Sequence, residues 1–303
     1  MAPPRMHADE VHTDVELVRR LLAEQFPEWA ELPVEPVRFF GTDNAIYRLG
    51  EELSVRLPRR EHNVQQLEKE RVWLPLIAPR LPLAVPVPVS FGKPGAGYPF
   101  DWAVYSWLEG EAAYETPPAD PIRTADDLAS LLAAFAQIDP AGRLQPGRHN
   151  AGRGGPLALR VEPCRNAISA LAGEIDAAAA TAVWEEALAA PEWSREPVLL
   201  HGDLDARNLL VTDGRLSGLV DFGTLGTGDP AADVMVAWKM LTLEARKRFR
   251  RELAVDDATW MRARGWALSQ AVIALAYYTM ETNPVLVRQA RGWLAEVLAD
   301  SPA

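Results

Sequence analysis

The sequence is poor in the features that mark secreted, membrane-spanning and zinc-binding proteins. It contains one cysteine, Cys164, so no disulfide can form within the chain and no second cysteine is present for a zinc site. No stretch approaches the ~18 uninterrupted apolar residues that a membrane-spanning helix needs. Residues 1–10 lack the apolar run of a signal peptide. We therefore expect a cytoplasmic protein with no membrane partner.

Basic residues are also few, because 31 Lys and Arg stand against 42 Asp and Glu, for a formal net charge of -11. Binding to a phosphate backbone needs clustered Lys and Arg that displace counterions, so we expect no nucleic acid polymer as partner. No feature demands an obligate protein partner. The chain has 303 residues, of which 48% are apolar. It is long enough for two domains or one bilobal unit.

The first third of the chain has the pattern of a small antiparallel sheet with one crossing helix. A leading helix is predicted by apolar residues at helical spacing over 9–26. Short β-prone runs separated by turn residues then predict strands at 37–40, 45–49, 53–57, 85–91 and 102–107. The helical period returns between them, over 61–77.

The remainder of the chain is mostly helical. We expect helices over 124–138, 162–175 and 177–190, with Thr124 as the N-cap of the first and Asp127 three residues further on. Residues 139–156 are rich in Gly, Pro and Arg and predict a long loop. Strands are expected at 197–200, 208–212 and 216–220, and helices resume at Asp229.

The most informative residues lie between these late strands. The order of the chain is His201-Gly202-Asp203-Leu204, then Asn208, then Asp221-Phe222-Gly223 thirteen residues later. This is the H-x-D-x-x-x-x-N spacing of a kinase catalytic loop followed by D-F-G, and each motif follows an apolar β-run. Either motif alone is a weak signal, but both in this order and this close form a strong one.

The residue types fit phosphoryl transfer. That reaction needs the γ-phosphate and an acceptor hydroxyl held in line, negative charge neutralised, and an acidic group to take the hydroxyl proton. We expect Asp203 to take the proton. Asn208 and Asp221 offer the hard oxygen ligands that Mg²⁺ prefers, and His201 is expected to brace the loop.

These motifs resemble those of the aminoglycoside phosphotransferase family, small-molecule kinases with macrolide phosphotransferases as close relatives. The resemblance covers nearly the whole chain, and it includes Asp221 followed by Gly228-Asp229-Pro230 and Asp233. It implies an α+β, protein-kinase-like bilobal fold. The expected N-terminal nucleotide-binding lobe has a small antiparallel sheet and spans 1–107. The larger, mainly helical lobe spans 108–303 and holds the catalytic loop, the metal site and the acceptor pocket.

The resemblance also implies nucleotide contacts in the first lobe. Thr42 and Asn44 lie where a kinase covers the phosphates, although no G-x-G-x-x-G is present. Arg56 stands where the third strand of a kinase carries lysine, and a guanidinium group can still bridge phosphate and carboxylate. We expect Glu70 to be its partner, with Glu68 as the alternative.

The run 103–110 resembles the linker between the lobes of a kinase. Backbone groups near Ser106 and Leu108 are expected there to bind the base of ATP or GTP. Because backbone groups carry this recognition, the side chains do not distinguish adenine from guanine.

The acceptor is expected to be a small hydroxylated molecule, because there is almost no room for an activation segment between Gly223 and Asp229 and no A-P-E follows. Asp205 beside the acceptor site favours a neutral or cationic substrate. Acidic residues at 174, 176, 185 and 186 form either an anionic wall or ordinary solvated helix faces. The aromatic residues Trp260, Trp266, Tyr277 and Tyr278 either line an apolar pocket or pack in the core.

The sequence therefore predicts a Mg²⁺-dependent O-phosphotransferase that moves the γ-phosphate of ATP or GTP to a small-molecule hydroxyl. An aminoglycoside-like or macrolide antibiotic is one candidate acceptor, and antibiotic resistance is then the expected role. The alternatives are a kinase of an ordinary metabolite, such as an amino alcohol or a sugar, and a non-catalytic nucleotide-binding regulator.

Overall fold

The computed structural model describes residues 10–37 and 43–300 of the chain, in two units that are treated separately below. Unit 1 comprises Met1–Gly110 and Gly218–Gly223, and unit 2 comprises Glu111–Ser217 and Thr224–Ala303. The sequence predicts a boundary after residue 107, and the chain leaves unit 1 after Gly110. The segment that carries Asp221 returns to unit 1, although the sequence predicts it in the second lobe.

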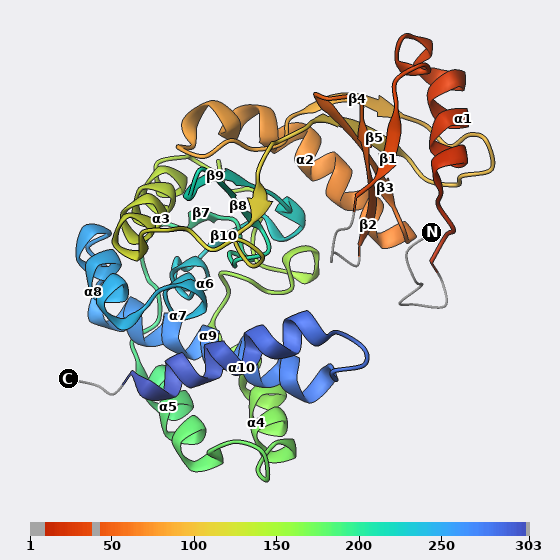
Figure 1. The fold of residues 1–303 in the computed structure, drawn as a ribbon. Helices are drawn as coiled ribbons and strands as arrows, with labels where there is room; N and C mark the ends of the chain where they lie inside the picture. Colours follow the sequence, from red (N-terminus) through yellow and green to blue (C-terminus); the bar gives the residue numbers. More distant parts are fainter. Residues whose placement is uncertain (1–9, 38–42, 301–303) are drawn as a thin grey trace. The chain divides into compact units, whose positions relative to one another are not determined.

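Unit 1 is built on a five-stranded antiparallel sheet in the order β1-β2-β3-β5-β4 (Figure 1). Its strands are β1 Val34–Pro36, β2 Asn44–Leu49, β3 Leu53–Pro58, β4 Pro88–Gly92 and β5 Trp102–Ser106. Of the strand predicted at 37–40, residues 38–40 lie outside the described residues. The described strand nearest to it, β1, ends at Pro36.

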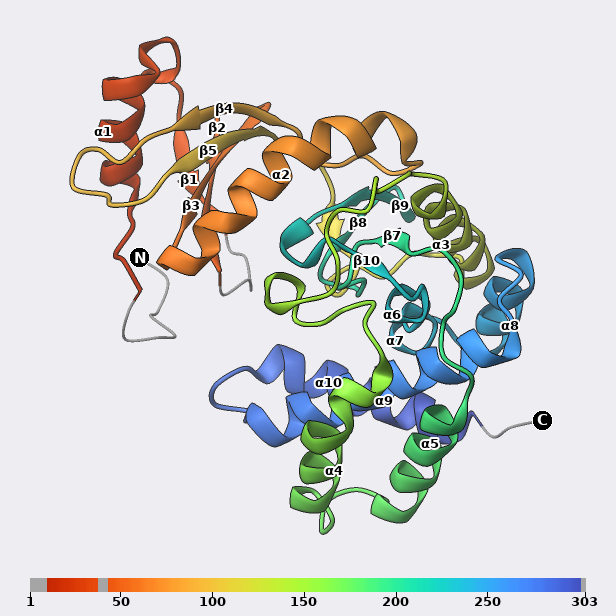
Figure 2. The same cartoon turned by 180° about the vertical axis from the view of Figure 1, so that it is seen from behind.

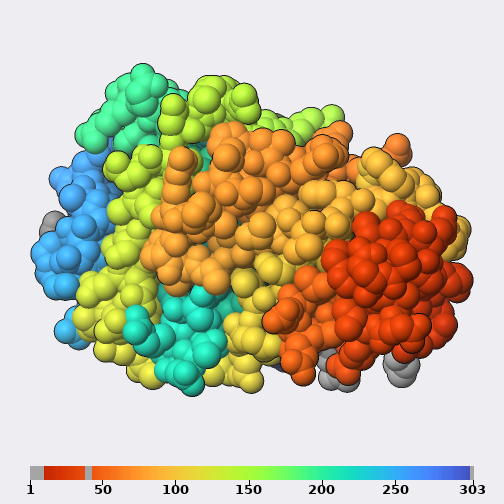
Figure 3. All heavy atoms as spheres, turned by 90° about the horizontal axis from the view of Figure 1, so that it is seen from above, coloured from red at the N-terminus to blue at the C-terminus, as the bar shows by residue number. Residues whose placement is uncertain are grey.

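Two helices cover opposite faces of this sheet. They are α1 Val15–Gln25 and α2 Val64–Ile77, with 3-10 turns η1 Pro27–Trp29, η2 Glu61–Asn63 and η3 Ala78–Arg80. The apolar face of α1 packs in one core with Val55 and Leu57 of β3. Successive side chains on a strand point to opposite faces, so Arg56 faces the other way, toward α2. Figure 3 shows that both helices expose an outer face.

Unit 2 is mainly helical (Figure 2). Its helices are α3 Pro121–Ala136, α4 Val161–Ala170, α5 Ala177–Ala189, α6 Ala231–Val234, α7 Val236–Met240, α8 Leu243–Glu252, α9 Asp257–Tyr277 and α10 Pro284–Ala299, with 3-10 turns η4 Arg148–Asn150 and η5 Leu157–Arg160. Most of α9 is buried, and α4, α5, α6, α7 and α10 all pack against it. It is therefore the central helix of the unit.

Short strands position the catalytic loop. They are β6 Glu111–Ala112, β7 Val198–Leu200, β8 Leu209–Thr212, β9 Arg215–Leu219 and β10 Gly226–Gly228, and the 3-10 turn η6 Phe222–Thr224 follows β9. One sheet has the order β6-β8-β9, and β10 pairs antiparallel with β7. The catalytic-loop motif lies between β7 and β8, and the D-F-G motif between β9 and β10. The sequence did not predict β6 and β10, because runs of two and three residues carry no periodicity.

Two helix starts differ from the prediction because local side chains cap the backbone. α1 begins at Val15, not near residue 9, because Asp14 Oδ1 accepts from Leu17 N at 2.7 Å. α3 begins at Pro121 with Asp120 as N-cap. Thr124, predicted as the cap, lies inside the helix, so that prediction is wrong. Proline at the first helical position suits this start, because its missing N–H is not needed there.

The longest helix, α9, carries charged residues within its apolar sequence, among them Arg262 and Arg264. Within 10–37 and 43–300, no helix combines the length and the apolar character that crossing a bilayer requires. Residues 267–272 of α9 are buried.

The cap of α3 can be tested directly. Asp120→Ala is expected to lower the free energy of unfolding by about 1 kcal/mol, because the Ile122 and Arg123 N–H groups lose their acceptor. Asp127→Ala is the matched control, with an expected change within about 0.5 kcal/mol. Chemical denaturation measures both. A larger loss for Asp127→Ala than for Asp120→Ala would contradict this assignment.

Candidate active site

A buried ion pair joins β3 to α2 in unit 1. Arg56 Nη1 donates to both carboxylate oxygens of Glu70, each at 2.8 Å. The Glu70 side chain is fully buried, and that of Arg56 is 11% exposed. The alternative partner Glu68 is exposed and lies near Arg71 instead. The predicted pairing of Arg56 with Glu70 is therefore confirmed.

Further groups of unit 1 surround this pair. The Tyr105 hydroxyl donates to Glu70 Oε2 at 2.6 Å. In the amide orientation that satisfies both side chains, Asn44 Oδ1 accepts from Arg56 Nε at 3.1 Å and from Nη2 at 2.9 Å. Arg56 Nη2 also lies 4.0 Å from Asp221 Oδ1. The structure thus brings together Asn44, Arg56, Glu70 and Asp221, as the resemblance implies.

The D-F-G segment is attached to α2 by a lysine that the sequence analysis missed. Lys69 Nζ donates to the Gly223 carbonyl at 2.5 Å. Burial lowers the pKa of Lys69 to about 8, although the nearby Glu70 and Asp221 carboxylates partly offset the effect. Asp221 itself has φ +64, a left-handed conformation that Asp tolerates better than most residues. The motif is therefore held by its backbone as well as by its side chain.

The remaining nucleotide-binding residues have mixed outcomes. Thr42 lies outside the described residues. The Ser106 N–H donates to the Val87 carbonyl, and the Trp107 N–H to the Glu52 carbonyl, so these two donors are already used within unit 1. Leu108 is half-buried at the end of this segment.

In unit 2, a buried carboxylate fixes the backbone before the predicted base. Asp233 accepts from His201 N and from Gly202 N, both at 2.7 Å. Gly202 has φ +84, and a Cβ there would lie 2.6 Å from the Thr224 carbonyl, so this position requires glycine. His201 is buried, and its carbonyl accepts from the Thr224 hydroxyl. The bracing role predicted for His201 is confirmed, and Asp233 holds the same segment.

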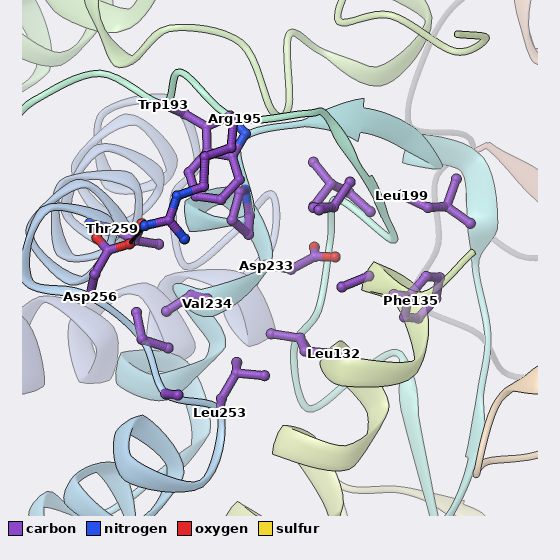
Figure 4. Close-up of a pocket in the computed structure, with 16 residues that line it drawn as sticks. Leu132, Phe135, Trp193, Arg195, Leu199, Asp233, Val234, Leu253, Asp256 and Thr259 are labelled. Atoms are coloured by element: carbon purple, nitrogen blue, oxygen red, sulfur yellow. Dashed lines mark hydrogen bonds and ion pairs between the residues drawn. The ribbon is translucent and has the colours of Figure 1, made fainter. Parts of the chain in front are cut away.

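Asp229 joins the start of α6 to α9. Its Oδ1 accepts from Ala231 N at 3.0 Å, and its Oδ2 accepts from Arg262 Nε at 2.6 Å. Near it, α3, β7 and the start of α9 line an apolar cavity of about 180 Å³. Figure 4 shows Asp233 in its wall among Leu132, Phe135 and Val234, and burial raises the pKa of Asp233.

The predicted base and metal ligand of unit 2 are neighbours. Asp203 is partly exposed, whereas Asn208 is buried. Asn208 Nδ2 donates to the Asp203 carbonyl at 2.9 Å and to Asp203 Oδ2 at 3.4 Å. Donation through the nitrogen leaves the amide oxygen of Asn208 as the group able to bind a cation.

Asp205 does not face an acceptor. Its side chain is fully buried, Arg207 Nη2 lies 2.5 Å from its Oδ2, and the fully buried Lys239 Nζ lies 3.4 Å from the same oxygen. Burial alone would raise the pKa of Asp205, but the charges of Arg207 and Lys239 outweigh it and hold the pKa well below its usual range. Lys239 Nζ also lies 3.9 Å from Asp203 Oδ1. The sequence could not show that Asp205 is neutralised within the protein.

Three of the four acids that the sequence offered as an anionic wall make contacts within unit 2. Asp176 caps α5 through Ala179 N, Glu185 pairs with Arg165, and Glu186 lies 3.5 Å from Arg264. Among the late aromatic residues, Trp266 is buried, Trp260 packs on Trp238 with ring centroids 4.5 Å apart, and Tyr277 is 70% exposed. Core packing is thus the observed role of the two tryptophans.

The chemistry of the donor set suits magnesium. Asn208 and Asp221 offer amide and carboxylate oxygens, and in the described part of the chain no group of three or more His, Cys, Asp or Glu residues is arranged to hold a metal. Mg²⁺ commonly binds through one or two protein oxygens together with nucleotide phosphates and water. The residues present therefore fit a magnesium ion that arrives with a nucleotide.

Comparisons with known proteins identify the family of the chain. A model of the phosphotransferase enzyme family matches residues 36–266. An Escherichia coli protein named aminoglycoside 3'-phosphotransferase is 26% identical over 163 residues, which are 52% of this chain and 58% of that protein. The match thus spans little more than half the length of that relative.

Two solved structures have a similar fold. The GDP and kanamycin complex of APH(2")-IIia has a TM-score of 0.70 and 19% identity, with 94% of this chain and 99% of that chain covered. Macrolide 2'-phosphotransferase MphH from Brachybacterium faecium has a TM-score of 0.61 and 21% identity, with 96% and 99% covered.

The predicted α+β fold, with a small antiparallel sheet in the N-terminal lobe and a larger helical C-terminal lobe, is confirmed by these two structures. The family match covers well over half of the chain and includes the residues from Asn44 to Asp233 described above. The chain therefore belongs to the phosphotransferase enzyme family.

Proposed function

We propose that this protein is a nucleotide-dependent O-phosphotransferase that moves the γ-phosphate of ATP or GTP to a hydroxyl group of a small molecule. One observation carries the proposal. Asp203 is partly exposed on a loop whose backbone Asp233 fixes through two 2.7 Å hydrogen bonds. A base for a hydroxyl proton needs both an accessible oxygen and a fixed position.

In this reaction Asp203 orients the acceptor hydroxyl and takes its proton. The acceptor oxygen then forms a bond to the γ-phosphorus, while the bond to the bridging oxygen of the nucleotide breaks and a nucleoside diphosphate leaves. Asn208 holds the loop closed by donating to Asp203. A magnesium ion bound by Asn208 and Asp221 supplies neutralisation of the phosphate charge.

The groups of unit 1 bind the nucleotide in this proposal. Arg56 reaches the phosphates while Glu70 holds its guanidinium group, and Asn44 and Thr42 contact the same phosphates. Backbone groups of Ser106 and Leu108 contact the base. Asp221 lies only three residues before Thr224, whose hydroxyl is bonded to His201 in unit 2.

The short segment after the D-F-G motif favours a small acceptor over a peptide. Six residues, from Thr224 to Asp229, join the motif to the capped end of α6, and three of them form β10. An antibiotic acceptor is supported by the relatives named for aminoglycosides and a macrolide. A metabolite kinase uses the same groups. The absence of lysine at position 56 would favour a non-catalytic regulator. The ion pair of Arg56 with Glu70 weighs against it, because arginine keeps the pairing expected of that lysine. We place the reaction in the cytoplasm, in keeping with the buried free thiol of Cys164.

Removal of the base is the first test. Asp203→Asn is expected to lower kcat by about 10²- to 10⁴-fold and to leave nucleotide affinity within a few fold. Asp213→Asn, on an exposed turn, is the matched control and should retain full activity. Mass gain of one phosphoryl group is measured across aminoglycosides, macrolides and amino alcohols. Retained turnover in Asp203→Asn would reject the assigned base.

The metal role of Asp221 makes a separate prediction. Asp221→Asn is expected to abolish the gain in nucleotide affinity that Mg²⁺ provides, because an amide binds the ion more weakly than a carboxylate. Asn tolerates the left-handed conformation at this position, so the backbone is preserved. Calorimetric titration of nucleotide with Mg²⁺ and with EDTA measures the effect. An unchanged magnesium dependence would contradict the ligand role.

The Arg56–Glu70 pair links stability to nucleotide binding. Glu70→Gln leaves a buried guanidinium without its charge partner, so we expect the free energy of unfolding to fall by about 3 kcal/mol. The KM for nucleotide is expected to rise about tenfold, since a loss of about 1.4 kcal/mol of binding has that effect. Glu68→Gln is the control, because Glu68 is exposed. Equal effects of the two variants would refute the specific role of Glu70.

A further inference from the structure

Two arginines of unit 2 lie against one buried indole. The guanidinium carbon of Arg153 is 5.7 Å from the centroid of the Trp266 ring, and that of Arg160 is 5.1 Å from it. Trp266 belongs to α9 and is 1% exposed. Arg160 ends η5, which packs against α9, and the segment before α4 runs beside that helix (Figure 2).

Neither arginine makes an ion pair among residues 10–37 and 43–300, although the charges of Asp203 and Asp233 act on Arg153 and partly offset the effect of burial on its pKa. Arg153 Nε donates to the Gly202 carbonyl at 2.9 Å, and Arg160 Nε donates to the Ser269 hydroxyl at 2.7 Å. Their terminal nitrogens make no ion pair within the described chain. Burial lowers the pKa of both groups, that of Arg160 to about 10, and the neighbouring charge of Arg153 adds to the effect on Arg160.

Other buried arginines of unit 2 are neutralised. Arg246 pairs with Glu296 and Asp300, and Arg262 pairs with Asp229. Partly buried charges are normally paired in this way, because desolvation is costly otherwise. Arg153 and Arg160 differ from these arginines, because neither makes an ion pair in the described part of the chain. The nearby charges of Asp203 and Asp233 act on Arg153, whereas no carboxylate of that part acts on Arg160.

The arginine pair is next to the proposed base. The carbonyl that Arg153 holds belongs to Gly202, the residue before Asp203. Two buried nitrogens on the same helix, Trp266 Nε1 and Gln270 Nε2, have no hydrogen-bond partner in the described part of the chain. They are four residues apart and so lie on one face of α9. This region thus has hydrogen-bond donors without partners, beside an arginine, Arg160, on which no carboxylate of the described chain acts.

We propose that the acceptor molecule carries an anionic oxygen group, a carboxylate or a phosphate, which Arg153 and Arg160 bind beside Asp203. The inference rests on the proposed phosphotransferase function and names its acceptor class. An anion bound by both guanidinium groups offsets their mutual repulsion, and a guanidinium group can donate two parallel hydrogen bonds to a carboxylate or a phosphate. Asp205 does not oppose this, because Arg207 and Lys239 neutralise it.

The binding test uses wild-type protein saturated with Mg²⁺ and a non-hydrolysable nucleotide, so that the nucleotide site is filled. Glucuronate, gluconate and glucose 6-phosphate are titrated, with glucose, glucitol and glucosamine as neutral and cationic counterparts. We expect tighter binding of the anionic probes. We expect Arg153→Gln and Arg160→Gln to weaken that binding by about ten- to a hundredfold, as for loss of a charged hydrogen bond.

Arg165→Gln is the matched control, because Arg165 is exposed and pairs with Glu185. It should bind all probes like wild type. Arg160→Lys keeps the charge and should restore part of the affinity, which a mere folding defect would not allow. If Arg153→Gln does not fold, the affinities of Arg160→Gln and Arg160→Lys for the anionic probes still test the inference. No preference for anions in wild type, or equal binding by all variants, overturns the inference.

Turnover separates this inference from the proposed function. The same probes and the aminoglycosides serve as acceptors with ATP and GTP, and transfer is read as mass gain. A selective loss of transfer to anionic acceptors in the arginine variants supports the inference. Better transfer to cationic acceptors overturns it and leaves the phosphotransferase proposal standing. An equal loss for every acceptor, together with slower nucleotide hydrolysis, overturns it too, because the arginines then act on the transferred phosphate.

Discussion

The buried pair of Arg56 and Glu70 is the contact on which the proposed nucleotide site depends. Neither charge can be buried alone, because desolvation of a single ion costs several kcal/mol. The pair therefore ties β3 to α2 and fixes which face of each element points inward. The hydroxyl group of Tyr105, on β5, also donates a hydrogen bond to Glu70. With these groups in place, the second terminal nitrogen of Arg56 is left within 4.0 Å of Asp221. One ion pair thus positions both Arg56, the cation proposed to bind phosphate, and the neighbouring Asp221, the acid proposed to bind metal.

In unit 2, buried carboxylates fix the backbone of the proposed catalytic loop. Asp233 takes two N–H groups of the catalytic loop, and Asp229 takes Arg262 and a helix N–H. Asp205 is neutralised by Arg207 and Lys239. Asp203 is the acid in this set that keeps an exposed carboxylate. The surrounding acids hold the loop rigidly. A rigid loop keeps the Asp203 carboxylate at a fixed position, as its proposed role as base requires.

Local sequence was enough to predict the features that depend on short spacing. The motif residues Asp203, Asn208 and Asp221 stood out by their order along the chain, and helical spacing favoured Glu70 over Glu68 as the partner of Arg56. The cap of α3 was misplaced because Thr124 and Asp120 are both good cap residues, and Pro121 at the next position decides between them. Residues that act over long separations escaped prediction. Lys239 lies 34 residues from Asp205, and Arg153 lies 49 residues from Gly202.

The charge around Asp203 shows why the fold alone does not name the acceptor. A fold shared with aminoglycoside and macrolide enzymes sets the place of the base, but side chains on loops and helix faces set what the base can meet. In this chain most of the acids that the sequence offered for a cationic acceptor are capping, paired or buried, as Asp176, Glu185 and Asp205 show. Arg153 and Arg160 make no ion pair in the described part of the chain, and no carboxylate there acts on Arg160. A polycationic acceptor would add positive charge beside these arginines, whereas an anion would offset it.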